Sequence, residues 1–580
     1  MNYLGIDMDD IVTNFFEENI GLLNDFKKIN SLIRNISGIN NFFNRQEDAS
    51  ELLEQLSINK NIFLKPERRE YGDFQTNIKL AEKVVKYIST RNSDFEFVLE
   101  PTCGQGNFIL AVLDNFPTLK KVVGIEIYQP YVKETMFKIL TFFLENKRQV
   151  IPDIDIINGN TFNYNFQKLS KETNQLKSLI IGNPPWVTNA ELGALNSENL
   201  PKKSNFKKFS GFDAITGKGN FDIGEYISIL MLEHFDKHDG YFGFLLKNSV
   251  IKNIVYEQKR NRFRISELGK LSIDSKKEFD ASVNASLFLT KLNKEPEFEC
   301  REIDFYSQKT QTDFGWSGRN FVFSLKNYSK SSFIDGESPF SWRSGIKHDC
   351  SKIMELELKG DIYTNLLGEQ FQLENNLVYG LLKSSDLKNL RTKNFRKLTI
   401  VTQKRIGEDT SYIKDNYPLT YQYLVGHQNY FGKRKSSIYL DKPKFSIFGV
   451  GRYSFAKYKV AISGLYKTTH FTLVEPFNDK ALMLDDTCYF IGFEDLKMAE
   501  MAHLILNSEI VQTFLDSIIF SDAKRPINKD ILMRISLCNA VERVNFNTIK
   551  ENLPELSGEE WTRFKKLINQ KANKQMLLFG

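Results

Sequence analysis

The stretch Val98-Leu99-Glu100-Pro101-Thr102-Cys103-Gly104-Gln105-Gly106-Asn107-Phe108 decides the fold. An apolar run ends at Glu100, a glycine-containing turn follows, and helical spacing begins near Asn107. Glycine lets the backbone approach a ligand closely, and a helix N-terminus directs free N–H groups at whatever binds there. The stretch therefore predicts a strand, a ligand-binding turn and a helix.

Other short β-rich runs follow this strand, and segments of helical length separate them. Strands that alternate with such segments are typical of a parallel sheet with helices on both faces. We therefore expect a doubly wound, Rossmann-like α/β domain over residues 66–295. The expected strands are 97–100, 122–126, 154–157, 179–182 and 241–246.

The remaining residues divide into three further parts. Residues 1–65 carry apolar residues at helical spacing with no proline before Pro66, which predicts a helical extension. Residues 296–545 lose the alternation and favour a second domain of mixed, mostly β (α+β) character, and residues 546–580 are a charged helical tail. A length of 580 residues with 41% hydrophobic residues suits two or three packed domains.

Composition excludes several classes of protein. Five cysteines stand far apart with no Cys-x-x-Cys pair, and six histidines are scattered, so we expect reduced thiols and no metal site. The longest apolar runs, such as 242–246, stop far short of the ~20 residues of a membrane span. The first residues do not resemble a secretory signal, so a cytoplasmic protein is expected.

Two carboxylates indicate which ligand the glycine turn binds. Glu126 ends the next expected strand, 22 residues after Gly104, a spacing that suits a carboxylate accepting both hydroxyls of a ribose. Glu100 would repel a pyrophosphate but would hold the cationic end of an amino acid. These features favour S-adenosylmethionine, and a glycine turn without a ligand is the alternative.

The segment Asn183-Pro184-Pro185-Trp186 follows another buried strand. The Asn183 side-chain oxygen and the Pro184 carbonyl could both accept hydrogens from an exocyclic NH2 group, which would direct the nitrogen lone pair towards a methyl group. The prolines stiffen the loop, and Trp186 offers a flat face to an aromatic ring. The alternative is a plain turn in which Asn caps and Pro stiffens.

Together these motifs resemble the amino-methyltransferases, in particular the N6-adenine-specific DNA methyltransferases of the gamma arrangement. The resemblance rests on Glu-Pro-x-x-Gly-x-Gly-x-Phe at 100–108, Gly-Ile-Glu at 124–126 and Asn-Pro-Pro-Trp at 183–186, and covers roughly residues 70–540. It implies a class I methyltransferase domain, then a DNA target-recognition domain, and a role in a bacterial restriction-modification system.

The resemblance also implies contacts to S-adenosylmethionine. Thr76 lies in the segment 71–76, which is similar to the one that closes over the methionine moiety, and Phe162 would be an apolar neighbour of the cofactor adenine. Asn160 stands where the family often has Asp, and its amide oxygen can still accept a bond from the adenine amino group. The implied contacts are Thr76, Glu100, Pro101, Cys103, Gly104, Gly106, Phe108, Glu126, Ile127, Asn160, Thr161, Phe162 and Asn183.

For the target base, Phe279 matches the second aromatic of the family, within the segment 278–288 that resembles the hairpin after the fifth strand. On spacing alone Phe279 is one of 48 phenylalanines and favours a core position. A base held between Trp186 and Phe279 would have left the duplex. The segment 220–223 resembles another part of the base pocket. The implied catalytic residues are Asn183, Pro184, Pro185, Trp186 and Phe279.

Charge indicates where DNA would bind. Between Tyr421 and Lys467 nine Lys or Arg face one acid, Asp441, and aromatic residues are interleaved with them. Such a surface suits phosphate contacts, with Arg452 behind a glycine turn as the candidate base reader, and a solvated basic face is the alternative. A second basic turn occupies 521–527. The expected DNA contacts are Arg452, Lys433, Arg434, Lys435, Lys457, Lys459, Lys524 and Arg525.

We therefore expect an enzyme that methylates N6 of a flipped adenine in a specific double-stranded DNA sequence, with a separately encoded restriction endonuclease as possible partner. Methylation of RNA or of a protein glutamine is an alternative, which the large, basic C-terminal domain disfavours. A catalytically silent DNA-binding subunit is another, disfavoured because every residue needed for transfer is present. A fused nuclease would need an Asp…Glu-x-Lys metal site, which residues 1–70 lack.

Overall fold

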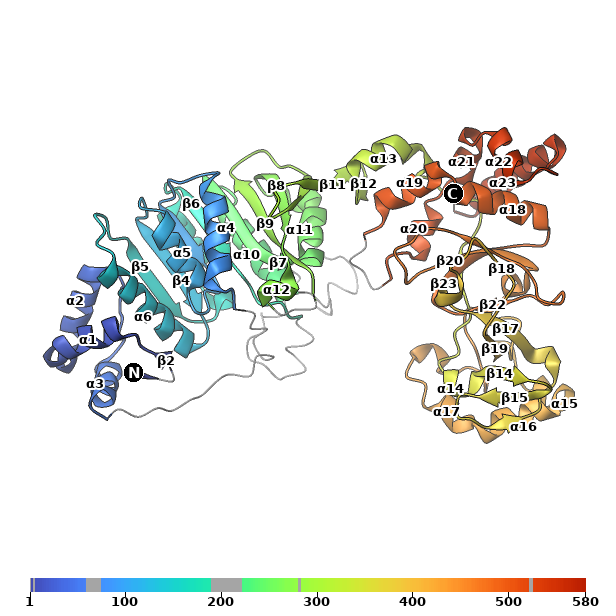
Figure 1. Ribbon diagram of the computed structural model, residues 1–580, viewed down its shortest axis with the longest axis horizontal. Coiled ribbons are helices and arrows are strands. Elements are labelled where there is room, and N and C mark those ends of the chain that lie inside the picture. The colour runs from blue at the N-terminus through green and yellow to red at the C-terminus, as the bar shows by residue number, and fades with distance from the viewer. Residues whose placement is uncertain are drawn as a thin grey trace. The chain divides into compact units, whose positions relative to one another are not determined.

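The computed structural model describes residues 2–3, 6–58, 75–188, 222–279, 283–520 and 525–579. The chain divides into two compact units, Met1–Phe321 and Val322–Gly580 (Figure 1). Parts of three segments singled out above, namely 71–74, 220–221 and 280–282, lie outside the described residues, as does Lys524.

A ten-stranded sheet forms the centre of the first unit, in the order β12-β11-β10-β8-β9-β7-β6-β3-β4-β5. The five expected strands are confirmed, and all neighbours among them pair in parallel. β9 lies antiparallel between β7 and β8. The bounds are β3 (Phe97–Glu100), β4 (Lys121–Glu126), β5 (Asp153–Asn158), β6 (Ser178–Gly182), β7 (Gly240–Lys247), β8 (Ile265–Ser272), β9 (Ala285–Leu292), β10 (Glu299–Asp304), β11 (Thr310–Ser317) and β12 (Asn320–Val322).

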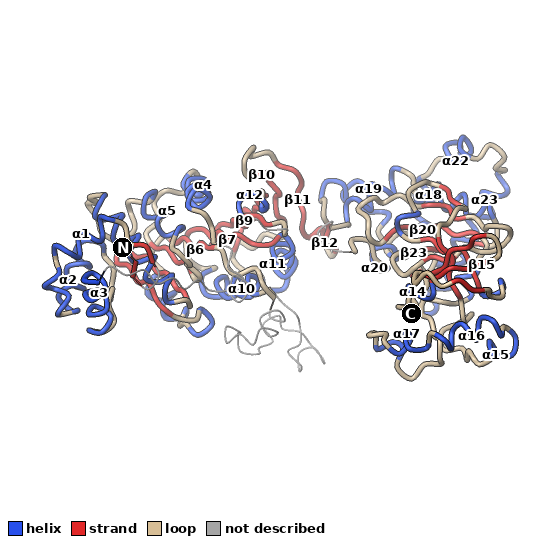
Figure 2. The backbone as a smooth tube through the Cα atoms, turned by 60° about the horizontal axis from the view of Figure 1, so that its bottom comes forward, coloured by secondary structure: helices blue, strands red, loops and turns tan. Residues whose placement is uncertain are grey.

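Helices cover both faces of this sheet. Figure 2 shows α4 and α5 on one side and α10 and α11 on the other. Every residue of β3 and β6 is buried, as expected for parallel strands covered on both faces. The doubly wound class is therefore confirmed. The helices are α4 (Ile78–Ser89), α5 (Asn107–Asn115), α6 (Gln129–Glu145), α7 (Phe166–Thr173), α10 (Ile223–Phe235), α11 (Asn248–Asn261) and α12 (Ser275–Phe279), with the 3-10 turn η2 (Thr161–Asn163).

The helical extension belongs to the core of the first unit. It contains β1 (Asn2–Tyr3), β2 (Ile6–Asp7), α1 (Asp10–Glu18), η1 (Ile20–Asn24), α2 (Phe26–Ser37) and α3 (Gln46–Ile58). Asp9 caps α1 by accepting a hydrogen bond from the Val12 backbone N–H at 2.9 Å. Phe16 and Phe42 pack against Phe137 of α6. The extension is thus packed against the sheet domain.

One part of the extension also continues the sheet at its β5 edge. Ile39 forms a parallel bridge with Ile154 of β5, and the Asn40 backbone N–H donates to the Ile154 carbonyl at 2.8 Å. The Asn40 side chain donates to Asp153 and Asp155 at 2.8 and 2.9 Å. The segment therefore occupies hydrogen-bonding groups of an edge strand.

The boundary between the units differs from the expected division at 295/296. β10 pairs in parallel with β8, and β11 continues the same sheet after it. Cys300 and Phe314 on these strands are buried. The first unit therefore extends to Phe321, because the strands after 296 bury their apolar residues against the catalytic sheet.

The second unit contains two sheets, in the orders β13-β23-β20-β21-β18 and β16-β15-β14-β19-β17-β22, which agrees with the mixed α+β expectation. The strands are β13 (Arg343–Ser344), β14 (Glu355–Lys359), β15 (Ile362–Asn365), β16 (Gln370–Phe371), β17 (Val378–Leu382), β18 (Arg391–Thr392), β19 (Lys397–Ile400), β20 (Tyr458–Ser463), β21 (Thr472–Val474), β22 (Met483–Leu484) and β23 (Cys488–Phe493).

Helices make up much of the rest of this unit. The tail expected at 546–580 is helical, and its Trp561, Phe564 and Ile568 pack into the hydrophobic cluster around Trp342, so the tail is part of the core. The helices are α13 (Leu325–Ser331), α14 (Ser351–Met354), α15 (Tyr412–Asn416), α16 (Pro418–Gly426), α17 (Gln428–Gly432), α18 (Leu496–Leu506), α19 (Glu509–Ile518), α20 (Lys529–Met533), α21 (Leu537–Arg543), α22 (Phe546–Asn552) and α23 (Gly558–Phe579).

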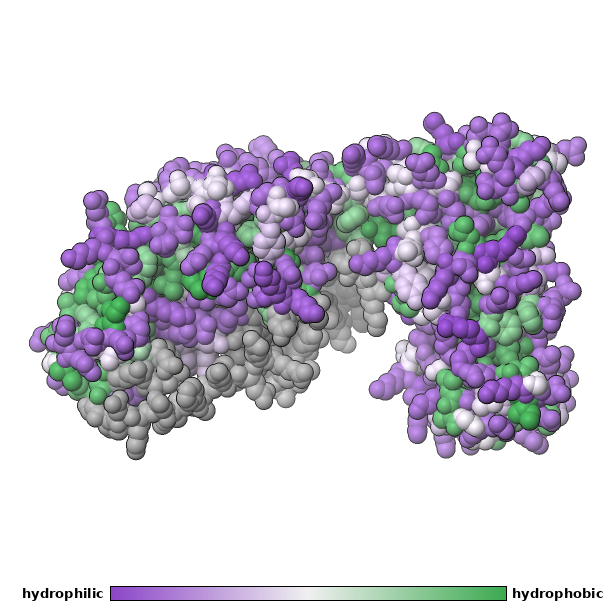
Figure 3. Space-filling view, viewed as in Figure 1, coloured by the Kyte–Doolittle hydropathy of each residue, from purple (hydrophilic) through white to green (hydrophobic). Residues whose placement is uncertain are grey.

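The described residues on the face seen in Figure 3 are mainly hydrophilic. Figure 3 shows hydrophobic side chains only in small, separate areas of the visible face. Among the described residues, no helix combines the length and the apolar character needed to cross a bilayer.

Candidate active site

A pocket opens at the carboxyl ends of β3, β4 and β6, the edge where doubly wound sheets bind ligands. It brings together nearly all the residues expected to contact the cofactor, and Pro101 and Gly106 are the exceptions. Residues that line it are Gln75, Thr76, Glu100, Thr102, Cys103, Gly104, Asn107, Phe108, Ile125, Glu126, Ile127, Tyr128, Tyr131, Asn160, Thr161, Phe162, Asn183, Pro185, Ile223 and Ile227.

The glycine turn wraps closely around its neighbours. Gly104 has φ 49° and Gly106 has φ 72°, in the left-handed region that favours glycine. A Cβ on Gly104 would lie 2.3 Å from Oε1 of Gln75, and one on Gly106 would lie 2.5 Å from Cγ2 of Thr135. Gly106 therefore shapes the turn against α6 without lining the pocket. Pro101 likewise does not line the pocket, and its carbonyl accepts a hydrogen bond from the Thr161 hydroxyl.

Glu126 is fixed by two backbone hydrogen bonds. The Gly104 N–H donates to Oε2 at 2.9 Å, and the Tyr128 N–H donates to Oε1 at 2.8 Å. A carboxylate oxygen can accept more than one hydrogen bond. The backbone bonds thus orient a carboxylate of the kind that accepts a pair of neighbouring hydroxyl groups.

Glu100 is a buried acid, 3% exposed. Burial raises its pKa well above the ordinary value, and the nearby Glu126 raises it further. Within the described residues its Oε2 has no hydrogen-bond partner, and the same holds for the hydroxyls of Thr76 and Thr102. Buried polar atoms left without partners are costly. These atoms fit a ligand with a cationic, hydrogen-bond-donating end such as the amino acid part of S-adenosylmethionine.

Asn160 has a structural role that the sequence analysis missed. Its Oδ1 accepts a hydrogen bond from the Phe162 backbone N–H at 2.9 Å and so caps η2. The Phe162 ring meets Tyr226 of α10 edge to face, with centroids 5.4 Å apart. Asn160 also lines the pocket.

Asn183 directly follows β6 and lines the same pocket, together with Pro185. Trp186 and Phe279 are both buried, and their rings touch edge to face with centroids 4.9 Å apart. The structure thus brings the two expected aromatic residues together. A base does not fit between rings this close, so the expectation that it lies between them does not hold for this arrangement.

Two tyrosines of the pocket were not anticipated. Tyr128 precedes α6 and Tyr131 lies in its first turn, with ring centroids 5.0 Å apart. The signal was their position just after Glu126, with the three-residue spacing that places side chains on one helix face. Of the segment 220–223, Ile223 also lines the pocket.

Several cations expected to contact DNA form hydrogen bonds or ion pairs within the second unit. Lys459 is 1% exposed, donates to the Ala456 carbonyl at 2.8 Å, and has its pKa lowered to about 7 by burial. It does not fit the expected role, because a buried ammonium group cannot reach a phosphate. Lys457 pairs with Asp479 at 3.0 Å, and Arg525 pairs with Asp486 at 3.3 Å.

Arg434 is also used internally. Its guanidinium donates to the Phe431 and Ser446 carbonyls at 3.1 and 2.6 Å and lies 3.6 Å from the centroid of the Tyr439 ring. It joins the two ends of the segment 431–446, so contact with DNA is not its evident role.

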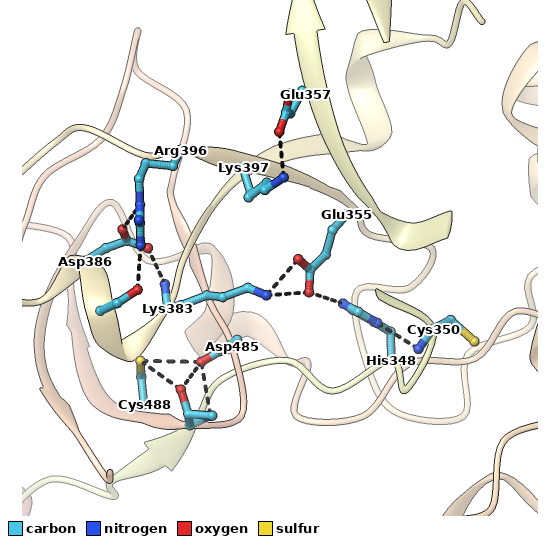
Figure 4. Close-up of polar contacts among 12 residues, drawn as sticks. His348, Cys350, Glu355, Glu357, Lys383, Asp386, Arg396, Lys397, Asp485 and Cys488 are labelled. Atoms are coloured by element: carbon cyan, nitrogen blue, oxygen red, sulfur yellow. Dashed lines mark hydrogen bonds and ion pairs between the residues drawn. The ribbon is translucent and has the colours of Figure 1, made fainter. Parts of the chain in front are cut away.

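Figure 4 shows other cations of the second unit in internal ion pairs. Lys383 donates to both carboxylate oxygens of Glu355 at 2.7 Å, and Lys397 lies 2.6 Å from Glu357. By contrast, Lys433, Lys435 and Arg452 are exposed and form no ion pair within the described part of the chain. These three remain candidates for contacts with DNA.

Comparison with known proteins identifies a relative that matches most of the chain. No family model matches the chain. The chain is 39% identical over 473 residues to the Type II methyltransferase M.NspV of Nostoc sp. (strain ATCC 29411 / PCC 7524), covering 81% of this chain and 96% of the relative. A tRNA/tmRNA (uracil-C(5))-methyltransferase of Psychromonas ingrahamii (strain DSM 17664 / CCUG 51855 / 37) is 24% identical over 205 residues, covering 31% of this chain and 55% of that one.

Among solved structures, the Type IIL restriction-modification enzyme MmeI in complex with DNA is similar over 97% of this chain and 90% of its own, with a TM-score of 0.49 and 11% identity. The match to the Nostoc enzyme extends over most of both chains. The chain therefore belongs to the type II methyltransferases, and its cofactor is S-adenosylmethionine.

Proposed function

We propose that this DNA methyltransferase transfers a methyl group to the N6 amino group of an adenine within a specific double-stranded DNA sequence. The observation that carries the proposal is that Asn183 lines the same pocket as Glu100 and Glu126. A loop suited to an exocyclic amine and carboxylates suited to the cofactor thus share one cavity.

The carboxylates of the pocket would hold the cofactor. Bound S-adenosylmethionine supplies a sulfonium methyl group that an amine can attack directly. Glu126 would accept the two ribose hydroxyls, since it lines the pocket and backbone N–H groups orient its two oxygens. Glu100 would accept from the amino group, because its buried Oε2 has no partner among the described residues. Phe162 and Ile127 line the pocket as apolar neighbours for the cofactor adenine.

The loop after β6 would orient the target amine. The Asn183 side-chain oxygen and the Pro184 carbonyl would each accept one amine hydrogen, which directs the lone pair out of the ring plane. Positioning and polarisation suffice for such a transfer, and the extra proton can leave after the methyl group has moved. A basic side chain is therefore not required.

An adenine that reaches Asn183 must leave the duplex, because the base stack shields its amino group from a buried site. Trp186 and Phe279 contact each other at 4.9 Å. A flipped base would therefore stack on one face of Trp186 or displace the Phe279 ring on entry. Stacking of an aromatic ring on the base would offset the loss of the contact between Trp186 and Phe279.

The second unit would recognise the DNA sequence. Lys433 and Lys435 would contact phosphates, and Arg452, exposed after the glycine turn at 449–451, would read a base edge. The biological role we propose is protection of host DNA from a separately encoded restriction endonuclease.

A transfer assay tests the proposal. Purified protein is incubated with methyl-labelled S-adenosylmethionine and bacterial duplex DNA, and the DNA is digested to nucleosides and separated. We expect label in N6-methyladenine, at one sequence that single-molecule sequencing identifies. Label in a methylated cytosine, or in RNA of the same sequence but not in DNA, would contradict the proposal.

A further inference from the structure

Lys247 lies beside the loop that carries Asn183. It ends β7, which pairs in parallel with β6, the strand that leads into the loop. Its ammonium donates to the Trp186 carbonyl at 3.1 Å and forms an ion pair with Asp222. The side chains of Lys247 and Asp222 are only 13% and 11% exposed. A single buried cation thus contacts both the loop that carries Asn183 and the residue before α10.

Asp222 connects this cation to the far end of the loop. Its Oδ1 accepts a hydrogen bond from the Gly224 N–H at 3.0 Å and caps α10. It also forms an antiparallel bridge with Thr188, and the neighbouring Ile223 N–H donates to the Val187 carbonyl at 2.9 Å. The chain after Trp186 is therefore attached to the start of α10, whose Ile223 lines the pocket.

Two residues of the loop cannot donate a backbone hydrogen bond. Pro184 and Pro185 have no backbone N–H, and the Lys247 ammonium is a charged donor to a carbonyl of this loop. A hydrogen bond from an ammonium to a carbonyl is stronger than one between neutral groups. A buried ion pair adds little net stability relative to apolar side chains of similar size, because both charges must leave water. The pair between Lys247 and Asp222 is therefore better explained by the position in which it holds the loop than by a gain in stability.

We propose that Lys247, restrained by Asp222, is a positioning residue that sets the orientation of the Asn183–Trp186 loop for transfer of the methyl group. The inference rests on the proposed function, in that this loop binds the target amine. Lys247 acts on the Trp186 carbonyl and does not itself touch the reacting atoms. Its removal should affect turnover far more than binding of S-adenosylmethionine. The carboxylates that would hold this cofactor, Glu100 and Glu126, lie on β3 and β4.

The first test is Lys247→Met, which keeps an unbranched side chain of similar length and removes its charge. We expect kcat for methyl transfer to duplex DNA to fall about tenfold to hundredfold, the effect of a small misplacement of reacting groups. The Kd for S-adenosylmethionine, measured by calorimetry, should stay within about twofold of the wild-type value. Lys247→Arg, which keeps a charged donor, should recover part of the lost kcat.

The matched control is the ion pair between Lys270 and Glu302, which lies on β8 and β10 of the same sheet. Its separation is 2.7 Å, and its side chains are 11% and 13% exposed, so its burial equals that of the pair at Lys247. Lys270→Met should lower the unfolding temperature as Lys247→Met does and leave kcat within about twofold. The difference between the two variants isolates the contact with the loop.

Asp222→Asn decides the matter if Lys247→Met does not fold. Asparagine keeps the oxygen that caps α10 and removes the charge that restrains Lys247. We expect kcat to fall with little change in the Kd for S-adenosylmethionine. Wild-type kcat in Asp222→Asn would overturn the inference, as would equal kcat in Lys247→Met and Lys270→Met, or a parallel loss of kcat and cofactor affinity.

The wild-type assay separates this inference from the proposed function. Label on any base of duplex DNA is counted, so the result does not depend on adenine being the target. If wild-type protein binds S-adenosylmethionine and leaves every duplex unlabelled, the proposed function fails and this inference fails with it. If the wild type labels DNA and the Lys247 and Asp222 variants do so equally fast, only the inference fails.

Discussion

The backbone N–H of Gly104 donates to the carboxylate of Glu126 at 2.9 Å, across 22 residues of sequence. The glycine turn and the acid at the end of the next strand therefore form one structure. The turn orients the carboxylate, and the carboxylate in return fixes a turn whose φ of 49° suits only glycine well. Neither feature would serve a ligand as well without the other.

Replacing Glu126 should weaken cofactor binding. Glu126→Ala removes a carboxylate that can accept two hydroxyls, and hydrogen bonds to a charged group are worth about 1.5–3 kcal/mol. We expect the Kd for S-adenosylmethionine, measured by calorimetry, to rise at least tenfold. Glu145→Ala, an exposed acid of the same unit, is the control. Unchanged affinity in Glu126→Ala would show that the ribose binds elsewhere.

Asn183→Ala should separate chemistry from binding. The change removes the side-chain oxygen that would accept an amine hydrogen, and loss of one such group costs about 10²–10³ in kcat. Binding of S-adenosylmethionine should change little. Single-turnover transfer to duplex DNA, together with calorimetry, measures both quantities. A variant that loses cofactor affinity and keeps its turnover would reverse the roles assigned to these residues.

Glu100 should make cofactor binding and stability depend on pH in opposite directions. Its pKa is raised by burial and by Glu126, so it takes up a proton above the usual range of Glu. As pH falls through this raised pKa, the carboxylate is lost and affinity for the cofactor should fall. Without cofactor, the folded state binds more protons than the unfolded state between the ordinary and the raised pKa, so stability should decrease as pH rises.

Glu100→Gln tests this relationship. At neutral pH the variant should unfold at a higher temperature than the wild type without cofactor, because Gln neither buries a charge nor takes up a proton on folding. Its affinity for S-adenosylmethionine should be lower, and the pH dependence of both quantities should flatten. Calorimetric scans across pH measure the effect. A less stable variant at neutral pH would contradict the prediction.

Salt dependence should distinguish exposed from buried lysines in the second unit. Lys435→Ala removes an exposed cation, and loss of one phosphate contact lowers the slope of log K against log salt by about 0.9. Lys459→Met is the matched control, because its cation is buried. Gel shifts with duplex DNA at several salt concentrations give both slopes. Equal slopes in the wild type and Lys435→Ala would remove Lys435 from the DNA surface.

Local patterns predicted the centre of the catalytic unit well. β3 and β6 are short apolar runs followed at once by Glu100 and Asn183, so strand, turn and side chain could be placed from neighbouring residues. The pocket unites these residues because the carboxyl ends of parallel strands lie at one edge of a sheet. For the same reason Glu126 could be matched to Gly104.

What the sequence could not show depends on tertiary contacts. Lys435 and Lys459 stand in the same basic stretch, yet one is exposed and the other buried, and burial is set by partners distant in sequence. The unit boundary was missed because β10 and β11 have the same local pattern as strands of the second unit. No sequence motif pointed to Lys247, because its partners Trp186 and Asp222 are distant along the chain.

The pairing of residues 38–40 with β5 has a practical consequence for dissecting this enzyme. Ile39 and Asn40 engage Ile154 on the last strand of the sheet. Starting an expression fragment after residue 58, so as to isolate the cofactor-binding fold, would uncover unpaired N–H and C=O groups along that strand. Open edges of this kind recruit strands from other molecules. A minimal catalytic fragment that stays monomeric in solution should therefore keep the first helices.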